Sequence, residues 1–344
     1  MRAFIFPGQG SQSVGMGKAL AEASAVAREV FQEVDEALGQ SLFRLMTEGP
    51  EDQLTLTENA QPAIMANAVA TLRVLEKEGG LRLSEKADYV AGHSLGEYSA
   101  LCAAGAFDLS TTARLLKLRG QVMQAATPVG TGAMAALLGA DIEKAQALAE
   151  AAAQGDVCTV ANDNDPGQVV ISGHKAAIDR AIELVKDHGI KRGILLPVSA
   201  PFHCPLMQPA ADAMAHALAD AALSAPLVPV YANVIAAPVA DAETILQQGA
   251  AVREHLVGRG RAEDDQIDFV GRDARSLQGT SRRRHRQIDG GLALRGDVAL
   301  ADAGALLDPL VAGLDHLLEI FVSQHLLGKM TAGAHDARIL QHVE

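Results

Sequence analysis

The sequence predicts a mixed α/β fold in which a small domain interrupts a larger domain built on a parallel sheet. Short apolar runs at residues 2–6 and 88–92 are each followed by glycines and then by helical periodicity, which is typical of strands that lead through tight loops into helices. The segment 128–197 has a different pattern, in which the predicted strands outnumber the predicted helices. Because 49% of the 344 residues are apolar and 21% are charged, the chain can bury a substantial core.

The larger domain is expected to comprise residues 1–127 and 198–248. Its first strand, residues 2–6, ends at Pro7 in a glycine loop. The second, residues 88–92, precedes another glycine turn. Apolar residues at helical spacing predict four helices, over 17–39, 60–78, 95–105 and 110–126.

The segment 128–197 predicts the order strand-helix-strand-strand-helix-strand, which is the ferredoxin-like pattern. Turn residues Asn162–Gly167 are expected to separate the two middle strands. We interpret this segment as a ferredoxin-like small domain inserted into the larger one. The expected strands are Ala133–Leu138, Val157–Ala161, Gln168–Ser172 and 192–197, and the expected helices are 141–153 and 174–188.

Charge and composition exclude several classes of protein. A net charge of −13 disfavours non-specific binding to nucleic acid or to an anionic membrane. No stretch approaches the roughly 20 apolar residues that span a bilayer, and the N-terminal apolar run is too short for a signal peptide. Three cysteines without metal-ligand spacing predict reduced, buried thiols. We therefore expect a cytoplasmic protein without a metal site, and a monomer by default.

The pentapeptide Gly92-His93-Ser94-Leu95-Gly96 fits G-x-S-x-G, the nucleophile elbow of hydrolase-like α/β domains. The glycines permit the strained turn, and the serine oxygen is exposed at its tip. The N-terminus of the following helix supplies free N–H groups and partial positive charge to an oxyanion. A chance turn containing Ser and Gly is the alternative. The strand before it and the helix after it favour a nucleophile at Ser94 in a hydrolase-like domain.

A nucleophilic serine needs a base, and the best candidate is His203. Pro201 and Pro205 flank it and restrict the local backbone, so the loop can set the direction of the imidazole. A loop histidine without a role is the alternative. His93 is the rival base, but neighbouring side chains diverge in an elbow, so we expect it to pack or bond locally.

Two further features are candidates for the same site as Ser94 and His203. The loop Phe6–Gln12 follows the first strand and can present a main-chain N–H to an oxyanion. It lacks the G-K-[ST] of a phosphate loop. Arg119 lies on the helix after the elbow. Most helical arginines are solvated surface charges, so this residue alone predicts little.

Taken together, the motifs resemble those of the malonyl-CoA:acyl carrier protein transacylase family, in order and in spacing. The similarity covers about residues 1–248. The motifs are FPGQGSQ at 6–12, QPA at 61–63, GHSLGEYSA at 92–100, LRG at 118–120, NDNDPGQVVISG at 162–173 and SAPFHCPLM at 199–207.

The resemblance implies a role for each site residue. Ser94 attacks the malonyl thioester, with His203 as base and later as acid. The backbone N–H groups of Gln9 and Leu95 form the oxyanion hole. Arg119 binds the free malonyl carboxylate. The last implied site residue is Phe202, which resembles the bulky residue of malonyl-selective members and crowds an α-methyl group.

The resemblance also implies the partners: malonyl-CoA as substrate, the phosphopantetheine thiol of an acyl carrier protein as acceptor, and no cofactor. A free-standing chain favours fatty acid biosynthesis over polyketide synthesis. The carrier is acidic in this family, so a local basic patch is expected to dock it. Ordinary solvated charge is the alternative reading of the candidate residues, which are Lys175, Arg180, Lys186, Lys191 and Arg192.

The resemblance stops at about Gln248. The family continues with an Arg-Trp pair and a strand leading into a Gly-x-Gly-Lys loop, whose backbone holds the catalytic histidine. Residues 249–344 contain neither, and they hold one Lys but eleven Arg. We interpret this atypical tail as out of frame relative to the family or poorly ordered; replaced sequence and a genuine extension are the alternatives. Loss of the strand would expose a sheet edge and reduce stability and activity.

Two other functions compete with transfer. A serine thioesterase or other hydrolase shares the elbow, but it normally carries an acidic residue between Ser and His and has no use for a pocket arginine. A non-catalytic remnant would bind carrier protein or CoA and would form no malonyl adduct on Ser94. Free malonate formed from malonyl-CoA in the presence of a carrier would favour the hydrolase.

Overall fold

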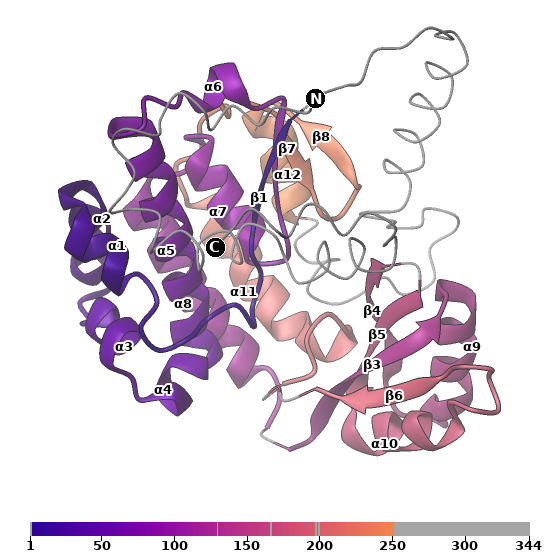
Figure 1. Ribbon diagram of the computed structural model, residues 1–344. Coiled ribbons are helices and arrows are strands. Elements are labelled where there is room, and N and C mark those ends of the chain that lie inside the picture. The colour runs from indigo at the N-terminus through magenta and orange to yellow at the C-terminus, as the bar shows by residue number, and fades with distance from the viewer. Residues whose placement is uncertain (1, 129, 166, 197, 199, 251–344) are drawn as a thin grey trace, which may run out of the picture. The chain divides into compact units, whose positions relative to one another are not determined.

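The computed structural model describes residues 2–128, 130–165, 167–196, 198 and 200–250 (Figure 1). Within this part, the strands form two four-stranded sheets with helices packed around them. Apart from residues 249 and 250, the tail 249–344 lies outside the described residues. What we expect of the tail therefore stays a prediction.

The first sheet has the order β1-β2-β7-β8. Its first three strands, β1 (Ala3–Phe6), β2 (Tyr89–Gly92) and β7 (Val230–Ala232), run parallel, and β8 (Ala237–Val239) is antiparallel to β7. The two strands predicted from the apolar runs at 2–6 and 88–92 are thus neighbours in a parallel sheet. Because β2 lies between β1 and β7, the residues that follow it emerge at the middle of the sheet edge.

Helices surround this sheet, and the most buried of them is α5, in which most residues are buried. Another, α7, packs against β1, β2 and β7. The helices of this part are α1 (Lys18–Ala23), α2 (Ala25–Leu38), α3 (Leu42–Glu48), α4 (Glu51–Thr55), α5 (Thr57–Lys77), α6 (Leu83–Lys86), α7 (Gly96–Ala103), α8 (Leu109–Ala125), the 3-10 turn η1 (Pro205–Met207), α11 (Gln208–Ala219) and α12 (Ala242–Ala250).

The prediction of one continuous helix over 17–39 is wrong, because Ser24 divides it into α1 and α2. Ser24 has an extended backbone, with φ −128° and ψ 129°. Its hydroxyl accepts a hydrogen bond from the N–H of Ala27 at 3.2 Å and so caps the start of α2. A serine that caps a new helix ends the preceding one, although the apolar periodicity continues through it.

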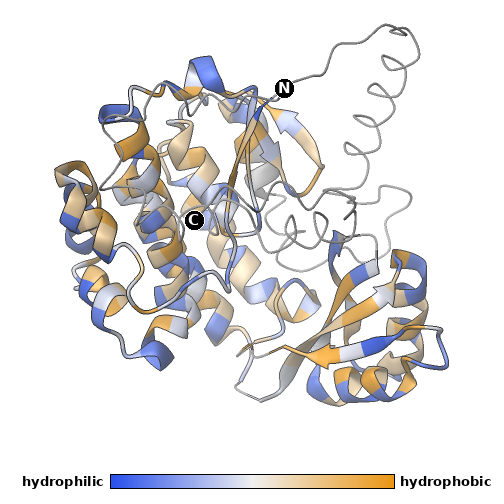
Figure 2. Ribbon diagram, in the orientation of Figure 1, coloured by the Kyte–Doolittle hydropathy of each residue, from blue (hydrophilic) through white to orange (hydrophobic). Residues whose placement is uncertain are grey.

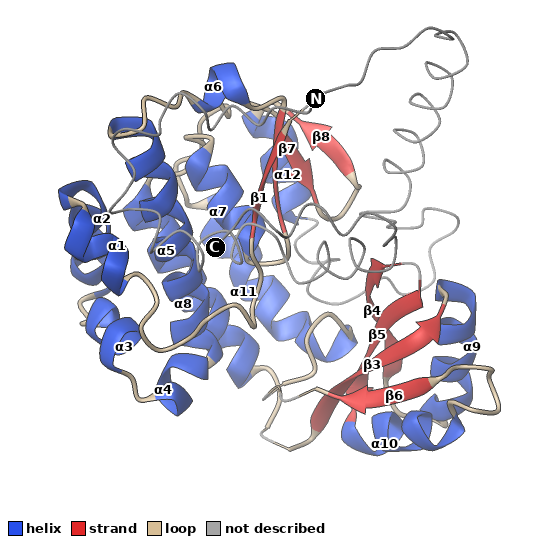
Figure 3. Ribbon diagram, in the orientation of Figure 1, coloured by secondary structure: helices blue, strands red, loops and turns tan. Residues whose placement is uncertain are grey.

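The second sheet is antiparallel and has the order β4-β5-β3-β6. Its strands are β3 (Gly132–Ala140), β4 (Cys158–Asp165), β5 (Gly167–His174) and β6 (Arg192–Leu195), and the helices α9 (Ile142–Ala153) and α10 (Lys175–Leu184) belong to the same segment. Figure 2 shows hydrophilic and hydrophobic residues alternating along both helices, beside the more hydrophobic β3. A cluster of buried residues between Ala133 and Ile190 gives this sheet its own core. Figure 3 shows the four strands with their helices.

The expected turn at Asn162–Gly167 is shorter than the sequence predicts. The strand β4 continues through these polar residues to Asp165, and β5 begins at Gly167. The pairing shifts register between Val160 and Asn162 and again between Asp163 and Asp165. Such bulges let a strand include residues with low β-propensity. The turn-like composition therefore predicts the end of β4 too early.

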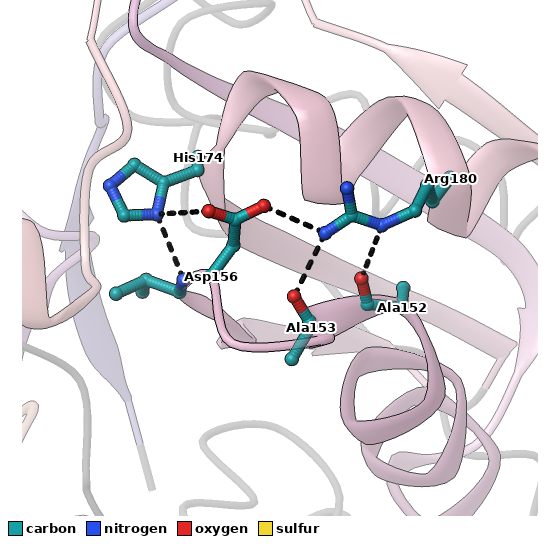
Figure 4. A network of polar contacts seen from close by, with 6 residues as sticks. Ala152, Ala153, Asp156, His174 and Arg180 are labelled. Atoms are coloured by element: carbon teal, nitrogen blue, oxygen red, sulfur yellow. Dashed lines mark hydrogen bonds and ion pairs between the residues drawn. The ribbon is translucent and has the colours of Figure 1, made fainter.

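A polar network ties the end of α9 to Arg180 in the middle of α10 and to His174, the residue before α10 (Figure 4). Arg180 donates hydrogen bonds to the carbonyl oxygens of Ala152 and Ala153, and to a carboxylate oxygen of Asp156, all at 2.8 Å. His174 accepts the N–H of Val157 on Nδ1 at 2.9 Å. The network satisfies carbonyl groups that the end of α9 leaves without helical partners.

None of the helices in the described residues is long and apolar enough to cross a membrane. All three cysteines are buried and free: Cys102, Cys158 and Cys204. Burial raises the pKa of each thiol, since a thiolate would lose its hydration. The thiols are therefore poor nucleophiles in the folded protein.

Candidate active site

Ser94 lies in a sharp turn between β2 and α7, as the elbow pattern predicts. Its φ is 53°, in the left-handed region that non-glycine residues rarely adopt. The turn is possible because its two glycines lack Cβ atoms. A Cβ on Gly92 would overlap the backbone of Gly96, and one on Gly96 would lie 2.5 Å from the carbonyl oxygen of Phe6. The turn is therefore packed against both its own helix and the end of β1.

The structure brings His203 to this serine from 109 residues away. Nε2 of His203 lies 3.4 Å from Oγ of Ser94, a long contact of the kind that tightens when substrate binds. In the neutral tautomer with its proton on Nδ1, Nε2 accepts the serine proton. His203 itself is buried and has φ 57°. The ring of His93, the rival base, instead lies against Gly8, where a Cβ would meet its Nδ1 at 2.5 Å.

Arg119 is buried, with 2% of its surface exposed, and it also reaches the serine. Its Nη2 donates to Oγ of Ser94 at 3.0 Å, and its Nη1 donates to Oε1 of Gln61 at 2.8 Å. The guanidinium carbon lies 5.8 Å from the centre of the Tyr98 ring, within cation–π range. Burial lowers the pKa of Arg119, and the nearby Tyr98 and Glu97 oppose that shift. A buried guanidinium beside the nucleophile is suited to binding an anionic group.

The glycine loop after β1 lies against the elbow. The N–H of His93 donates to the carbonyl oxygen of Phe6 at 3.2 Å. The side chain of Gln9 donates to the hydroxyl of Thr57 at 3.2 Å, which anchors the loop to α5. Among the described residues, neither the backbone N–H of Gln9 nor that of Leu95 has a hydrogen-bond acceptor. The predicted role of these two N–H groups as the oxyanion hole stays a prediction.

Phe202 is buried in the same loop as His203. This loop packs on the second sheet, because a Cβ added to Gly132 at the start of β3 would lie within 2.7 Å of three atoms of the Pro201 ring. The thiol of Cys204 donates to the carbonyl oxygen of Pro201 at 3.0 Å. The loop is thus packed on β3 and stabilised by a hydrogen bond of its own. The predicted role of Phe202 in excluding an α-methyl group stays a prediction.

Three further residues complete the site, and sequence reasoning assigned none of them a role. Gln61 holds Arg119, and the only signal for it was its place in the QPA motif. Asn233 accepts the N–H of Ser94 on Oδ1 at 3.1 Å. Glu97 accepts the backbone N–H of Asn233 on Oε2 at 3.0 Å. Burial raises the pKa of Glu97 to about 7, although the hydrogen bonds from Asn233 favour its charged form.

The acyl transferase domain family matches residues 3–254 of the chain. The malonyl CoA-acyl carrier protein transacylase of Escherichia coli K12 is 46% identical over 255 residues, which are 74% of this chain and 79% of that relative. The chain belongs to the malonyl-CoA:acyl carrier protein transacylase family. The family predicted from the motifs is therefore confirmed.

Solved structures of the transacylase family have the same fold. An acyl-carrier-protein S-malonyltransferase from Bartonella henselae is 53% identical, with a TM-score of 0.72 over 76% of this chain and 82% of its own. A malonyl-transacylase in complex with its type II PKS acyl-carrier protein is 39% identical, with a TM-score of 0.72 over 82% of this chain and 85% of its own. The mixed α/β fold with parallel strands is thus that of the family.

Proposed function

We propose that this transacylase moves a malonyl group from malonyl-CoA to the phosphopantetheine thiol of an acyl carrier protein, through a malonyl-serine intermediate at Ser94. The observation that carries the proposal is the position of one hydroxyl. Oγ of Ser94 lies between an imidazole at 3.4 Å and a buried guanidinium at 3.0 Å. The imidazole can take its proton, and the guanidinium can bind the second carboxylate of a malonyl thioester.

In the first half-reaction, Oγ of Ser94 attacks the thioester carbonyl while its proton passes to Nε2 of His203. The resulting oxyanion accepts hydrogen bonds from the N–H groups of Gln9 and Leu95. When the C–S bond breaks, His203 returns the proton to the CoA thiolate. The second half-reaction runs the same steps in reverse, with the carrier thiol in the place of CoA. Neither a metal ion nor a cofactor takes part in these steps.

The selectivity for malonyl groups rests on Arg119 and Phe202. A planar guanidinium can form two parallel hydrogen bonds with a carboxylate. Phe202, next to the base, would crowd a substituent on the α-carbon, and one methyl group is worth roughly 1–3 kcal/mol of discrimination. The pathway that we propose is fatty acid biosynthesis in the cytoplasm, with the enzyme acting as a monomer.

We also propose a division into domains. Residues 1–127 and 198–248 would form the hydrolase-like catalytic domain, and residues 128–197 would form an inserted ferredoxin-like subdomain. The element order β3-α9-β4-β5-α10-β6 and the separate core of the second sheet support this division. The contact between Gly132 and Pro201 links the subdomain to the loop that carries the base.

The test of the function is transfer of a labelled malonyl group. Wild type incubated briefly with malonyl-CoA should accumulate label on Ser94 and pass it to added carrier protein. Ser94→Ala should abolish the labelling. Arg119→Ala should lower malonyl use by about 10- to 100-fold, which corresponds to the loss of a charged hydrogen bond worth roughly 1.5–3 kcal/mol. It should relatively favour acyl groups that lack the carboxylate.

The same experiment separates the alternatives. Release of free malonate in the presence of the carrier would identify a hydrolase. A wild-type protein that acquires no label on Ser94 would be a binding remnant, and the proposal would then be wrong.

A further inference from the structure

Asn233 follows β7 directly and makes two hydrogen bonds to the nucleophile elbow and one to Glu97 in α7, although it lies more than 130 residues away in sequence. Its Oδ1 accepts the N–H of Ser94 at 3.1 Å, and its Nδ2 donates to the carbonyl oxygen of Gly92 at 2.8 Å. Its own backbone N–H donates to Oε2 of Glu97 at 3.0 Å. The residue is 5% exposed, so water does not compete freely for these bonds.

The two side-chain bonds act on consecutive peptide groups. The carbonyl of Gly92 belongs to the peptide before His93, and the N–H of Ser94 belongs to the peptide after it. One planar amide therefore fixes both peptide planes on the entry side of the turn. The orientation of the second plane sets where Cβ and Oγ of Ser94 point.

The turn needs such support because its backbone is strained. A non-glycine residue at φ 53° costs on the order of 1–3 kcal/mol and persists only where the surroundings over-determine it. Glu97 supports the same arrangement from the first turn of α7, where a carboxylate is favoured by the helix dipole. It holds the backbone of Asn233 and so fixes the amide relative to the helix.

We propose that Asn233 is a positioning residue for the transfer reaction: its amide holds the elbow so that Oγ of Ser94 meets His203 and Arg119. This inference rests on the proposed function. It goes beyond that function by assigning a step-specific role to a residue that touches neither substrate nor base. Binding of malonyl-CoA through Arg119, which lies on α8, should depend little on Asn233.

The test compares wild type with Asn233→Leu, which keeps the volume of the side chain but neither of its hydrogen bonds. In single-turnover experiments, the maximal rate of malonyl-enzyme formation should fall about 10- to 100-fold, since a misplacement of roughly 1 Å can cost 10²-fold. The malonyl-CoA concentration that gives half this rate should change less than about twofold, because binding energy common to the ground and transition states is kept.

A second measurement needs neither malonyl nor CoA. Phenylmethanesulfonyl fluoride sulfonylates an activated serine, and its reaction with Ser94 should slow by a similar factor in Asn233→Leu. If wild type acquires no malonyl label but Asn233→Leu still slows sulfonylation, the proposed function fails while the positioning role stands. If wild type transfers malonyl and Asn233→Leu matches it in both rates, the function stands and the inference is overturned.

Loss of stability must be separated from loss of position. Val30→Ala truncates a fully buried side chain on α2 and serves as the matched control for a destabilised but correctly arranged site. If its melting temperature equals that of Asn233→Leu, Val30→Ala should still react at the wild-type rates. Equal slowing in both variants would show that Asn233 is merely structural. Should Asn233→Leu fail to fold, Asn233→Ser, which also lacks the amide, carries the same measurements and expectations.

Discussion

Glu97 makes the stability of the protein depend on pH in an unusual direction. Burial raises its pKa from an ordinary 4.5 to about 7, so the folded state holds this proton more tightly than the unfolded state does. The stabilising contribution is complete below pH 4.5. It declines as the pH rises and is lost above about pH 7, and the difference amounts to at most about 3 kcal/mol.

Glu97→Gln should remove this decline, because glutamine keeps an acceptor for the N–H of Asn233 but does not titrate. We expect the variant to be less stable than wild type, or equal to it, at pH 4.5, and to gain on it by pH 7.5. Urea denaturation at the two pH values measures the difference. Glu143→Gln, in the first turn of α9 but exposed, is the matched control. A gap between wild type and Glu97→Gln that is the same at both pH values would contradict the prediction.

The sequence predicts individual site residues where the backbone conformation requires a particular residue type. The glycines at 92 and 96 are required because a Cβ at either position would clash with backbone atoms, so the elbow can be recognised from five letters. Arg119 looks like any helical arginine, and only its burial beside Gln61 and Ser94 separates it from a surface charge. Asn233 carries no local signal, because its bonds to the elbow exist only after β7 and β2 have paired.

The helices α5 and α8 cross at Gly120, and this contact sets the position of the neighbouring Arg119. A Cβ on Gly120 would lie 2.6 Å from the backbone nitrogen of Glu58 and 2.7 Å from the carbonyl carbon of Thr57. Backbone atoms cannot swing aside as a flexible side chain can. Any side chain at position 120 must therefore push the two helices apart, next to the residue that contacts the nucleophile.

Gly120→Ala should lower the free energy of unfolding by about 1–3 kcal/mol, as overpacking does. This is opposite to the gain of roughly 1 kcal/mol that alanine gives over glycine inside an exposed helix. The change should also slow malonyl-enzyme formation, because Arg119 moves with α8. Chemical denaturation and single-turnover labelling check both effects. Arg114→Ala, exposed on the same helix, should alter neither. A Gly120→Ala variant as stable as wild type would show that the helices can adjust.

Several elements that the sequence predicts well are long enough to show a period. The helices α5 and α8 and the strand β3 lie within a few residues of their expected ranges. The strands β7 and β8 have three residues each, too few for any period to appear, and pairing with β2 defines them. The break at Ser24 was missed because capping leaves the apolar spacing unchanged.

For the whole molecule, composition predicts a globular acidic protein, and the series of motifs predicts its family. Neither predicts how a protein of this charge would dock the acidic carrier that the family resemblance implies. A net charge of −13 repels such a partner at long range, but charges are screened beyond about 8–10 Å at physiological salt. Docking must then depend on local positive charge.

The structure narrows the candidates for that local charge. Of the five basic residues considered, Lys175 is paired with Asp179, and Arg180 is engaged by Asp156 and by two carbonyl groups. The other three, Lys186, Lys191 and Arg192, are exposed. Lys191 and Arg192 are adjacent, and Arg192 begins β6. Within the part of the chain that the structure describes, these three make no ion pair that a carrier would have to break.

We expect the double variant Lys191→Glu/Arg192→Glu to raise the KM for the carrier protein by about tenfold, because charge reversal at the rim of an interface slows association. Malonyl-enzyme formation from malonyl-CoA should not change, since it needs no carrier. The control Lys18→Glu/Lys77→Glu alters the net charge equally at exposed positions on α1 and α5. An equal rise in KM for both double variants would mean that overall repulsion, and not a local patch, governs docking. If the KM for the carrier rises only in Lys191→Glu/Arg192→Glu, the difference from wild type should shrink as salt is added. Salt screens the attraction between these two positions and the carrier, which the charge reversal removes.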